Sequence, residues 1–444
     1  MTSLRAAASA LDALAPVRVS GRVTAVRGGL VEASGLAGLV AVGSACRVAR
    51  TGGEWVAGEV VGMQGQATVL ALHGHPAGLA ADAAVELVAS AEPRPCDAWL
   101  GRVIDAFARP LDDAGPLPQG PAPYALRATP PPALARRTQG PKVATGVRVL
   151  DTFLPLCRGQ RIGLFAGSGV GKSTLMAMLA RHVAADVVVI GLIGERGKEV
   201  SAFLEDTLGA DGLARAVVVV STSDQPPLTK RRAAQTTLAV AEYFRDRGHH
   251  VLCLLDSVTR YAEAQREIGL AAGEPPTTRA FPPSTFSEMA ALLERAGPGA
   301  RASADGDITA VFTVLVQGGD MEEPVADNVR AILDGHVVLE RAIAERGRFP
   351  AIDVLKSVSR ALPGCHGERE NALIRAARRH LAHYDSMATM IRLGAYQAGS
   401  DAATDAAIRI VPVVEAFLGQ AIEEATPPPE SFERLGALLE DDGA

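Results

Sequence analysis

Hydrophobic and polar residues follow three successive patterns along the chain. In residues 17–90, short β-rich stretches at 17–26, 30–33, 39–42, 54–61, 67–72 and 84–88 alternate with glycine-containing turns. Such regularly spaced short strands are typical of a small barrel or sandwich, so we predict a β-barrel domain here. The preceding residues 1–16 are alanine-rich with leucines near one helical face, which leaves a short amphipathic helix and a frayed tail as alternatives.

The second pattern begins near residue 147. Apolar runs at 162–165, 187–192, 217–220, 251–255 and 310–316 are separated by helical segments. Because parallel strands covered on both faces consist of continuous apolar runs, this alternation predicts an α/β domain with a parallel sheet. We expect the proline-rich residues 91–145 to form an extended linker within this domain, which then spans 91–367. From Glu368 the chain becomes helical and charged, and we predict a C-terminal helical domain over 368–444.

Composition narrows the class of protein. A chain of 444 residues is too long for one hydrophobic core, and 48% hydrophobic with 21% charged residues is ordinary globular composition. The net charge of −6 argues against nucleic-acid binding as the main function. Five scattered cysteines form no C-x-x-C pair, which indicates free thiols in a reducing cytoplasm. Because no apolar run reaches membrane-spanning length and no signal peptide is evident, we expect only peripheral membrane contact.

The most informative stretch is 161–174, which reads R-I-G-L-F-A-G-S-G-V-G-K-S-T. An apolar strand leads into a glycine-rich turn and then a helical run, the order of a Walker A phosphate loop. The strict pattern has glycine at its first position, where this chain has Ala166, and we interpret that alanine as tolerated. Lys172 is expected to reach the β/γ-phosphates, and the Ser173 hydroxyl to hold Mg²⁺. The residues expected to bind nucleotide here are Gly167, Ser168, Gly169, Val170, Gly171, Lys172, Ser173 and Thr174.

A charged turn follows the run 187–192. Glu195 lies in this turn, and a carboxylate at the end of a strand beside the phosphate loop can orient the attacking water. Glu199 is the second candidate for that role, and we count Arg196 among the catalytic candidates. Taken alone, this pattern is weak, because charged loops are usually only solvated.

The run 252–255 ends in an acidic residue, Asp256. This is the arrangement of a Walker B strand, whose carboxylate binds the water shell of Mg²⁺. An aspartate at the end of an apolar run is also a common strand-terminating residue, so its position downstream of a phosphate loop supports the functional interpretation. Arg260, one helical turn later, is expected to face the nucleotide pocket.

Two further candidates come from less specific patterns. Phe349 precedes Pro350, and an exposed aromatic ring held in this way could stack on adenine, although the pattern alone favours a core phenylalanine. Arg360, in the stretch S-V-S-R, could donate its guanidinium group to the γ-phosphate bound by a neighbouring subunit. No spacing rule selects Arg360, so the pattern leaves this role open.

Six stretches of the chain carry a resemblance to a known family. They read L-F-A-G-S-G-V-G-K-S (164–173), G-L-I-G-E-R-G-K-E-V (191–200), L-L-D-S-V-T-R-Y-A (254–262), G-E-P-P-T-T-R-A-F-P-P-S (273–284), A-I-L-D-G-H (331–336) and K-S-V-S-R (356–360). Over residues 21–420 the chain resembles the type III export ATPases, which are relatives of the rotary ATP synthase β subunit. The sequences of these motifs are most similar to those of the flagellar branch, and the injectisome branch is a close second. The departures are small: Ala280-Phe281, where relatives often have glycine and an aromatic residue, and a less acidic loop at 317–320.

The resemblance implies an N-terminal β-barrel, a RecA-like parallel-sheet ATPase domain and a C-terminal helical domain. It implies a cytoplasmic homohexamer, peripheral on the inner membrane, that hydrolyses Mg-ATP and delivers substrates to the flagellar export apparatus. It assigns phosphate and Mg²⁺ binding to Lys172 and Ser173, water activation to Glu195, the Walker B role to Asp256, action in trans to Arg360 and adenine stacking to Phe349. The implied partners are a stator-like regulator at the N-terminal segment, a central stalk protein, the export gate and chaperone–substrate complexes.

Three alternatives stand beside this interpretation. A virulence-type secretion ATPase would have the same catalytic site, since partners distinguish the two systems. A non-catalytic nucleotide-binding subunit of a rotary assembly is disfavoured by the intact Glu195 and Arg360, which a purely structural copy does not need. An RNA-translocating hexamer is disfavoured because the N-terminal region lacks a basic groove with aromatic side chains, and we expect no nucleic-acid partner.

Overall fold

The computed structural model describes residues 18–138, 140–301 and 306–440. The chain divides into two compact units, each described by itself below. The first contains the described part of residues 1–91 together with 225–229 and 263–285, and the second contains 92–224, 230–262 and 286–444. The predicted N-terminal segment 1–16 lies outside the described residues.

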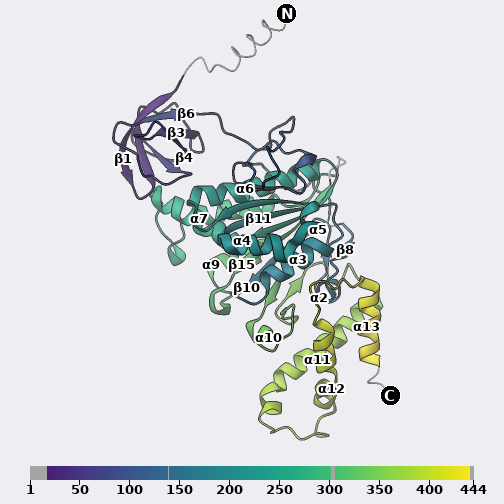
Figure 1. Cartoon of the computed structure of the whole chain (residues 1–444). Helices are drawn as coiled ribbons and strands as arrows, with labels where there is room; N and C mark the ends of the chain where they lie inside the picture. Colours follow the sequence, from purple (N-terminus) through teal and green to yellow (C-terminus); the bar gives the residue numbers. More distant parts are fainter. Residues whose placement is uncertain (1–17, 139, 302–305, 441–444) are drawn as a thin grey trace, which may run out of the picture. The chain divides into compact units, whose positions relative to one another are not determined.

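The first unit contains a closed antiparallel barrel, as the fold class predicted (Figure 1). Its strands are β1 (Ser20–Arg27), β2 (Leu30–Ser34), β3 (Ala45–Ala49), β4 (Trp55–Gln64), β5 (Ala67–Leu72) and β6 (Ala84–Leu87), in the closed order β1-β2-β5-β4-β3-β6. The strand predicted at 39–42 is wrong: Leu39 and Val42 lie in turns and are 60% and 58% exposed. Strand β3 follows instead, because Cys46 and Val48 alternate into the barrel core.

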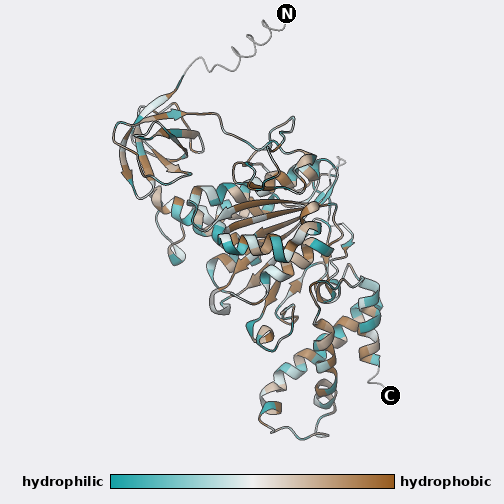
Figure 2. Cartoon of the chain, in the orientation of Figure 1, coloured by the Kyte–Doolittle hydropathy of each residue, from teal (hydrophilic) through white to brown (hydrophobic). Residues whose placement is uncertain are grey.

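The second unit is built around a mostly parallel sheet whose strands are largely hydrophobic (Figure 2). Its strands are β7 (Val103–Asp105), β10 (Arg161–Ala166), β11 (Val187–Glu195), β12 (Ala216–Thr222), β13 (His250–Asp256), β14 (Gly297–Pro298), β15 (Asp307–Leu315), β16 (Gly335–Leu339) and β17 (Val358–Ser359). The main path runs β17-β16-β10-β15-β13-β11-β12-β7, and β14 pairs with β15. All five predicted apolar runs are strands of this sheet. Strand β7 comes from the expected linker, which is therefore partly built into the sheet.

Helices cover both faces of this sheet (Figure 1). From β10 to β12 the chain moves along the sheet in one direction, through α3 (Lys172–His182), α4 (Gly197–Ala202), the π-helical turn η2 (Phe203–Leu208) and α5 (Gly209–Ala214). From β12 to β15 it moves back in the other direction, through α6 (Pro227–Asp246), α7 (Val258–Ala271) and α8 (Pro283–Glu294). Because crossovers between parallel strands are right-handed, the two sets lie on opposite faces. The remaining short elements are η1 (Asp97–Trp99), β8 (Lys142–Val143), β9 (Leu156–Cys157), η3 (Thr278–Ala280), η4 (Gln317–Gly319), α9 (Pro324–Ile332) and α10 (Arg341–Glu345).

The C-terminal helices are α11 (Glu368–Arg392), α12 (Ala402–Leu418) and α13 (Pro428–Glu440). They pack around α2 (Arg148–Phe153), whose Leu150 and Phe153 share one hydrophobic cluster with Val414 of α12 and Leu435 of α13. The predicted helical region at the C-terminus is therefore confirmed. Within the described ranges, no helix is long and apolar enough to cross a membrane.

Candidate nucleotide-binding site

The phosphate loop joins β10 to α3, as predicted. Gly169 and Gly171 have φ angles of 76° and 91°, in the left-handed region that glycine adopts without a steric penalty. Ala166 is the buried last residue of β10 and is absent from the positive-φ positions, so this site does not require glycine. The loop therefore keeps the turn geometry that brings backbone N–H groups together at the start of α3, where anions bind.

Lys172, the first residue of α3, lies between two carboxylates. Its Nζ donates to Oδ1 of Asp256 at 2.5 Å and to Oε1 of Glu195 at 3.3 Å. The lysine side chain is 11% exposed. Burial lowers the pKa of Lys172, but Asp256 and Glu195 outweigh this effect, so the net pKa lies above its usual value. Three of the predicted site residues are thus brought together at the carboxyl ends of β11 and β13, where ligands bind open α/β sheets.

Glu195 combines partial burial with an unusual pKa. Its pKa is raised to about 7: burial contributes most, the negative charge of Asp256 also raises the pKa, and Lys172 lowers it. Glu199 hydrogen-bonds to Glu195, and this bond lowers the pKa of Glu199. The side chain of Glu199 is 51% exposed, against 18% for Glu195. Of the two candidates, Glu195 therefore has the environment expected of a general base that works near neutral pH.

Asp256 is held by a residue that the sequence patterns missed. Thr313 on β15 donates its hydroxyl to Oδ1 of Asp256 at 2.6 Å, and both side chains are buried. Strands β13 and β15 are paired, with Leu255 opposite Phe312, so the two residues that follow are level with each other. The only signal in the sequence is a polar residue inside an apolar run, which does not reveal its partner.

Oxygen donors near the loop suit a magnesium ion. Ser173 is exposed at the start of α3, Thr174 follows it, and Asp256 supplies a carboxylate next to Lys172. Mg²⁺ is typically held by one or two carboxylates and by substrate phosphates, with water in its remaining positions. The described residues contain no cluster of three or more acidic, histidine or cysteine ligands.

The two arginines near Glu195 differ in placement. The side chain of Arg196 is 80% exposed and pairs with Glu199 at 3.2 Å. Arg260, in the first turn of α7, packs over Gly194: a Cβ atom added at that glycine would lie 2.7 Å from Cγ of Arg260. Arg260 is therefore adjacent to the backbone of the strand end that carries Glu195.

Phe349 lies beside the phosphate loop and is 42% exposed, so it is not a core residue. A Cβ atom added at Gly171 would come within 3.3 Å of Cδ1 of Phe349. The ring also lines a cavity of about 1120 Å³ together with Gln420 and residues of α10, α11 and α12. This exposed ring next to the loop has the placement that base stacking requires.

Arg360 lies at the opposite end of the sheet from the phosphate loop. It follows β17, in which Ser359 pairs with Gly335, and its backbone N–H donates to the carbonyl of Asp334 at 3.1 Å. Asp334 in turn contacts Arg161, the first residue of β10, whereas the loop follows the last. Five residues of strand separate these ends by roughly 16 Å. The exposed Arg360 is thus remote from the Lys172 of its own chain.

Two family models and several known proteins match most of this chain. The model of the ATP synthase alpha/beta family, nucleotide-binding domain, matches residues 146–359, and that of the T3SS EscN ATPase C-terminal domain matches 367–437. The chain is 52% identical to the flagellum-specific ATP synthase of Caulobacter vibrioides over 98% of this chain and 99% of that protein. It is 44% identical to the type 3 secretion system ATPase of Pseudomonas syringae pv. tomato, over 96% of this chain and 95% of that protein.

Solved structures show the same likeness. The assembled ATPase EscN from the enteropathogenic E. coli type III secretion system matches with a TM-score of 0.86 and 36% identity, over 94% of this chain and all of that one. The structure of EscN in complex with its central stalk EscO matches with a TM-score of 0.84 and 37% identity, over the same shares.

Proposed function

This chain belongs to the ATP synthase alpha/beta family, within the group of flagellar and type III secretion export ATPases, and we propose that it hydrolyses Mg-ATP as a homohexamer serving flagellar protein export. The observation that carries the proposal is the cluster of Lys172, Glu195 and Asp256 beside the glycine loop. The flagellar assignment is supported by the 52% identity to the flagellum-specific ATP synthase of Caulobacter vibrioides.

Each residue of the cluster has a distinct task in this proposal. Lys172 exchanges its contacts with Asp256 and Glu195 for the triphosphate, which carries more negative charge than either carboxylate. Glu195 then loses a partner and is available to orient the attacking water and accept its proton. Ser173 and Asp256 would hold Mg²⁺, which neutralises charge on the β- and γ-phosphates when bound. Phe349 is assigned to the base and Arg260 to the wall of the pocket.

The proposal includes catalysis across a subunit interface. Arg360 is exposed at the edge of the sheet, far from the loop of its own chain, which supports a role at the phosphates of an adjacent protomer. An arginine supplied in this way stabilises the charge of the transition state. A homohexameric ring would place each Arg360 at a neighbour's site.

The remaining partners follow from the relatives. EscN was solved with a central stalk protein, and we propose that this chain contacts a similar stalk. From the family resemblance we also propose that a regulator binds the N-terminal segment, and that the ring docks to the export gate at the cytoplasmic face of the membrane. The segments 1–16, 17–90, 91–367 and 368–444 remain the proposed domain boundaries.

The test is a phosphate-release assay on purified protein across a range of protein concentrations. We expect Mg-ATP turnover that rises more than in proportion to protein concentration, because assembly completes the site. Lys172→Ala should abolish turnover, whereas Lys198→Ala, which removes the same charge from an exposed position, should not. A folded wild-type protein without turnover would instead support a non-catalytic subunit, and stimulation by single-stranded RNA would support a translocase.

A virulence-type secretion ATPase is the second candidate, favoured by the match to assembled EscN. Complementation separates the two. The gene should restore motility to a flagellar ATPase mutant more effectively than it restores effector secretion to an injectisome mutant.

A further inference from the structure

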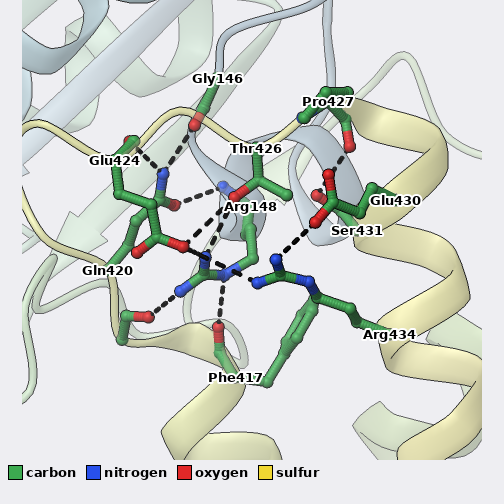
Figure 3. A network of polar contacts seen from close by, with 11 residues as sticks. Gly146, Arg148, Phe417, Gln420, Glu424, Thr426, Pro427, Glu430, Ser431 and Arg434 are labelled. Carbon is green, nitrogen blue, oxygen red and sulfur yellow. Dashed lines mark hydrogen bonds and ion pairs between the residues drawn. The ribbon is translucent and has the colours of Figure 1, made fainter.

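A buried polar network joins the C-terminal helices to the nucleotide-binding domain (Figure 3). Arg148, at the start of α2, is 6% exposed. Its Nε donates to the carbonyl of Phe417 at 3.0 Å, and its Nη1 to the hydroxyl of Thr426 at 3.0 Å. The same guanidinium group also contacts Gly419 and Glu424. One arginine therefore holds the segment 417–426, which begins at the end of α12.

Gln420 lies within this segment, and its side-chain amide makes three hydrogen bonds. Its Oε1 accepts from the backbone N–H of Arg148 at 2.8 Å. Its Nε2 donates to the carbonyls of Gly146 at 2.7 Å and Glu424 at 2.6 Å. Because one partner is a donor and two are acceptors, the amide has a single orientation. The side chain of Gln420 is thereby fixed to the domain that carries the phosphate loop.

The backbone of Gln420 reaches the proposed base-binding ring. Its N–H donates to the carbonyl of Phe349 at 2.8 Å. The preceding residue, Arg348, pairs with Glu415 of α12 at 2.7 Å. Phe349 and Gln420 also line the same cavity. The exposed ring at the phosphate loop is thus anchored through its main chain to the segment that Arg148 holds.

We propose that Gln420 is a positioning residue for nucleotide binding, which sets the place of Phe349 relative to the phosphate loop and thereby determines affinity for the base. The inference rests on the proposed function for the assignment of Phe349 to the base. A simpler role would be to fasten the C-terminal helices to the sheet domain. The two roles differ in what they predict for a ligand that has phosphates and no base.

The experiment compares two probes by isothermal titration in the presence of Mg²⁺: the non-hydrolysable β,γ-imido analogue of ATP, and inorganic tripolyphosphate. In Gln420→Ala we expect the Kd of the nucleotide analogue to rise about fivefold or more, the scale of lost aromatic–base stacking. The Kd of tripolyphosphate should stay within about twofold, because the loop and Lys172 are unchanged. In turnover assays the KM for ATP should rise while kcat is retained.

Two comparisons sharpen the result. Phe349→Ala should show the same split, and the double variant should be no worse than the more severe single one, since both act on one contact. Arg434→Ala is the control, because the Arg434 side chain belongs to the same network but pairs with Glu430 and Glu424 and not with Gln420 or Phe349. This variant should bind both probes as the wild-type protein does. If Gln420→Ala does not fold, Gln420→Met, which has similar length and volume, must show the same split.

Equal losses for both probes, or no loss for either, would overturn the positioning role. These outcomes leave the proposed function intact, because they concern only the variant. If the wild-type protein bound neither probe, the proposed function itself would fail, and the positioning role with it.

Discussion

Replacing Glu195 by glutamine separates the chemistry of the site from its ability to bind nucleotide. Glutamine has the same shape and keeps an oxygen that can accept from Lys172, whose Nζ is 3.3 Å from the carboxylate. It cannot take a proton from water. General-base catalysis contributes about 10²- to 10⁴-fold, so turnover should fall by that factor. Nucleotide affinity should be retained or increased, because a negative charge beside the triphosphate is removed.

The pKa of Glu195, raised to about 7 mainly by burial, adds a pH signature. The carboxylate must be ionised to act as a base, and its ionised fraction increases as the pH rises. Between pH 6 and pH 8 that fraction grows about tenfold, and kcat/KM of the wild-type enzyme should increase by about the same factor. In Glu195→Gln this increase should disappear. Excess Mg²⁺ in the assay keeps ionisation of the nucleotide from contributing.

The assay is steady-state phosphate release at several pH values, with nucleotide binding measured separately by titration. Glu205→Gln makes the same change of charge on an exposed side chain ten residues away. It should leave turnover within about twofold of wild type, since exposed charges contribute little. Turnover of Glu195→Gln close to that of wild type, or an unchanged rise with pH in that variant, would refute the role of Glu195.

Two further changes test the loop and the fold. Gly171→Ala forces alanine to a φ of 91°, and it should lower stability by about 1–2 kcal/mol and abolish most nucleotide binding. Gly197→Ala, where an added Cβ meets nothing within 4 Å, should change neither property. Equal shifts in the melting temperatures of the two variants would contradict this expectation. Asp112→Asn should lower the free energy of unfolding in urea by about 1 kcal/mol at pH 7, because Asp112 accepts hydrogen bonds from Arg102. Those bonds hold the pKa of Asp112 below its usual range, so its stabilisation is present at neutral pH and lost in acid; the difference from wild type should therefore shrink toward pH 3, and a constant difference would count against the pair.

Local signals made much of the site predictable. The phosphate loop, Glu195 and Asp256 each lie where an apolar strand ends, and parallel strands bring such ends to one edge of a sheet. Thr313, Arg148 and Gln420 act through tertiary contacts, and Gln420 is 272 residues from Arg148 in the sequence. Periodicity carries no information on such pairs.

The fold shows the same division between local and tertiary causes. Continuous apolar runs identified the buried strands, because burial on both faces leaves no place for polar residues. The prediction placed a strand at 39–42, where the structure instead has β3 shortly afterwards, because the exposed Leu39 and Val42 are as hydrophobic as core residues. Only closure of the barrel determines which of the two stretches pairs with β4. Strand β7 has only three residues in a proline-rich region, so its pairing with β12 decides its conformation.

The central claim is that one protomer holds the triphosphate while its neighbour supplies an arginine. It is tested most directly by mixing Arg360→Ala protein with Glu195→Gln protein and measuring phosphate release. Each variant alone should be nearly inactive. In a randomly mixed ring, about a quarter of the interfaces combine an intact Glu195 with an intact Arg360 from the adjacent chain, and activity should return in that proportion. A mixture as inactive as its two components would contradict the claim.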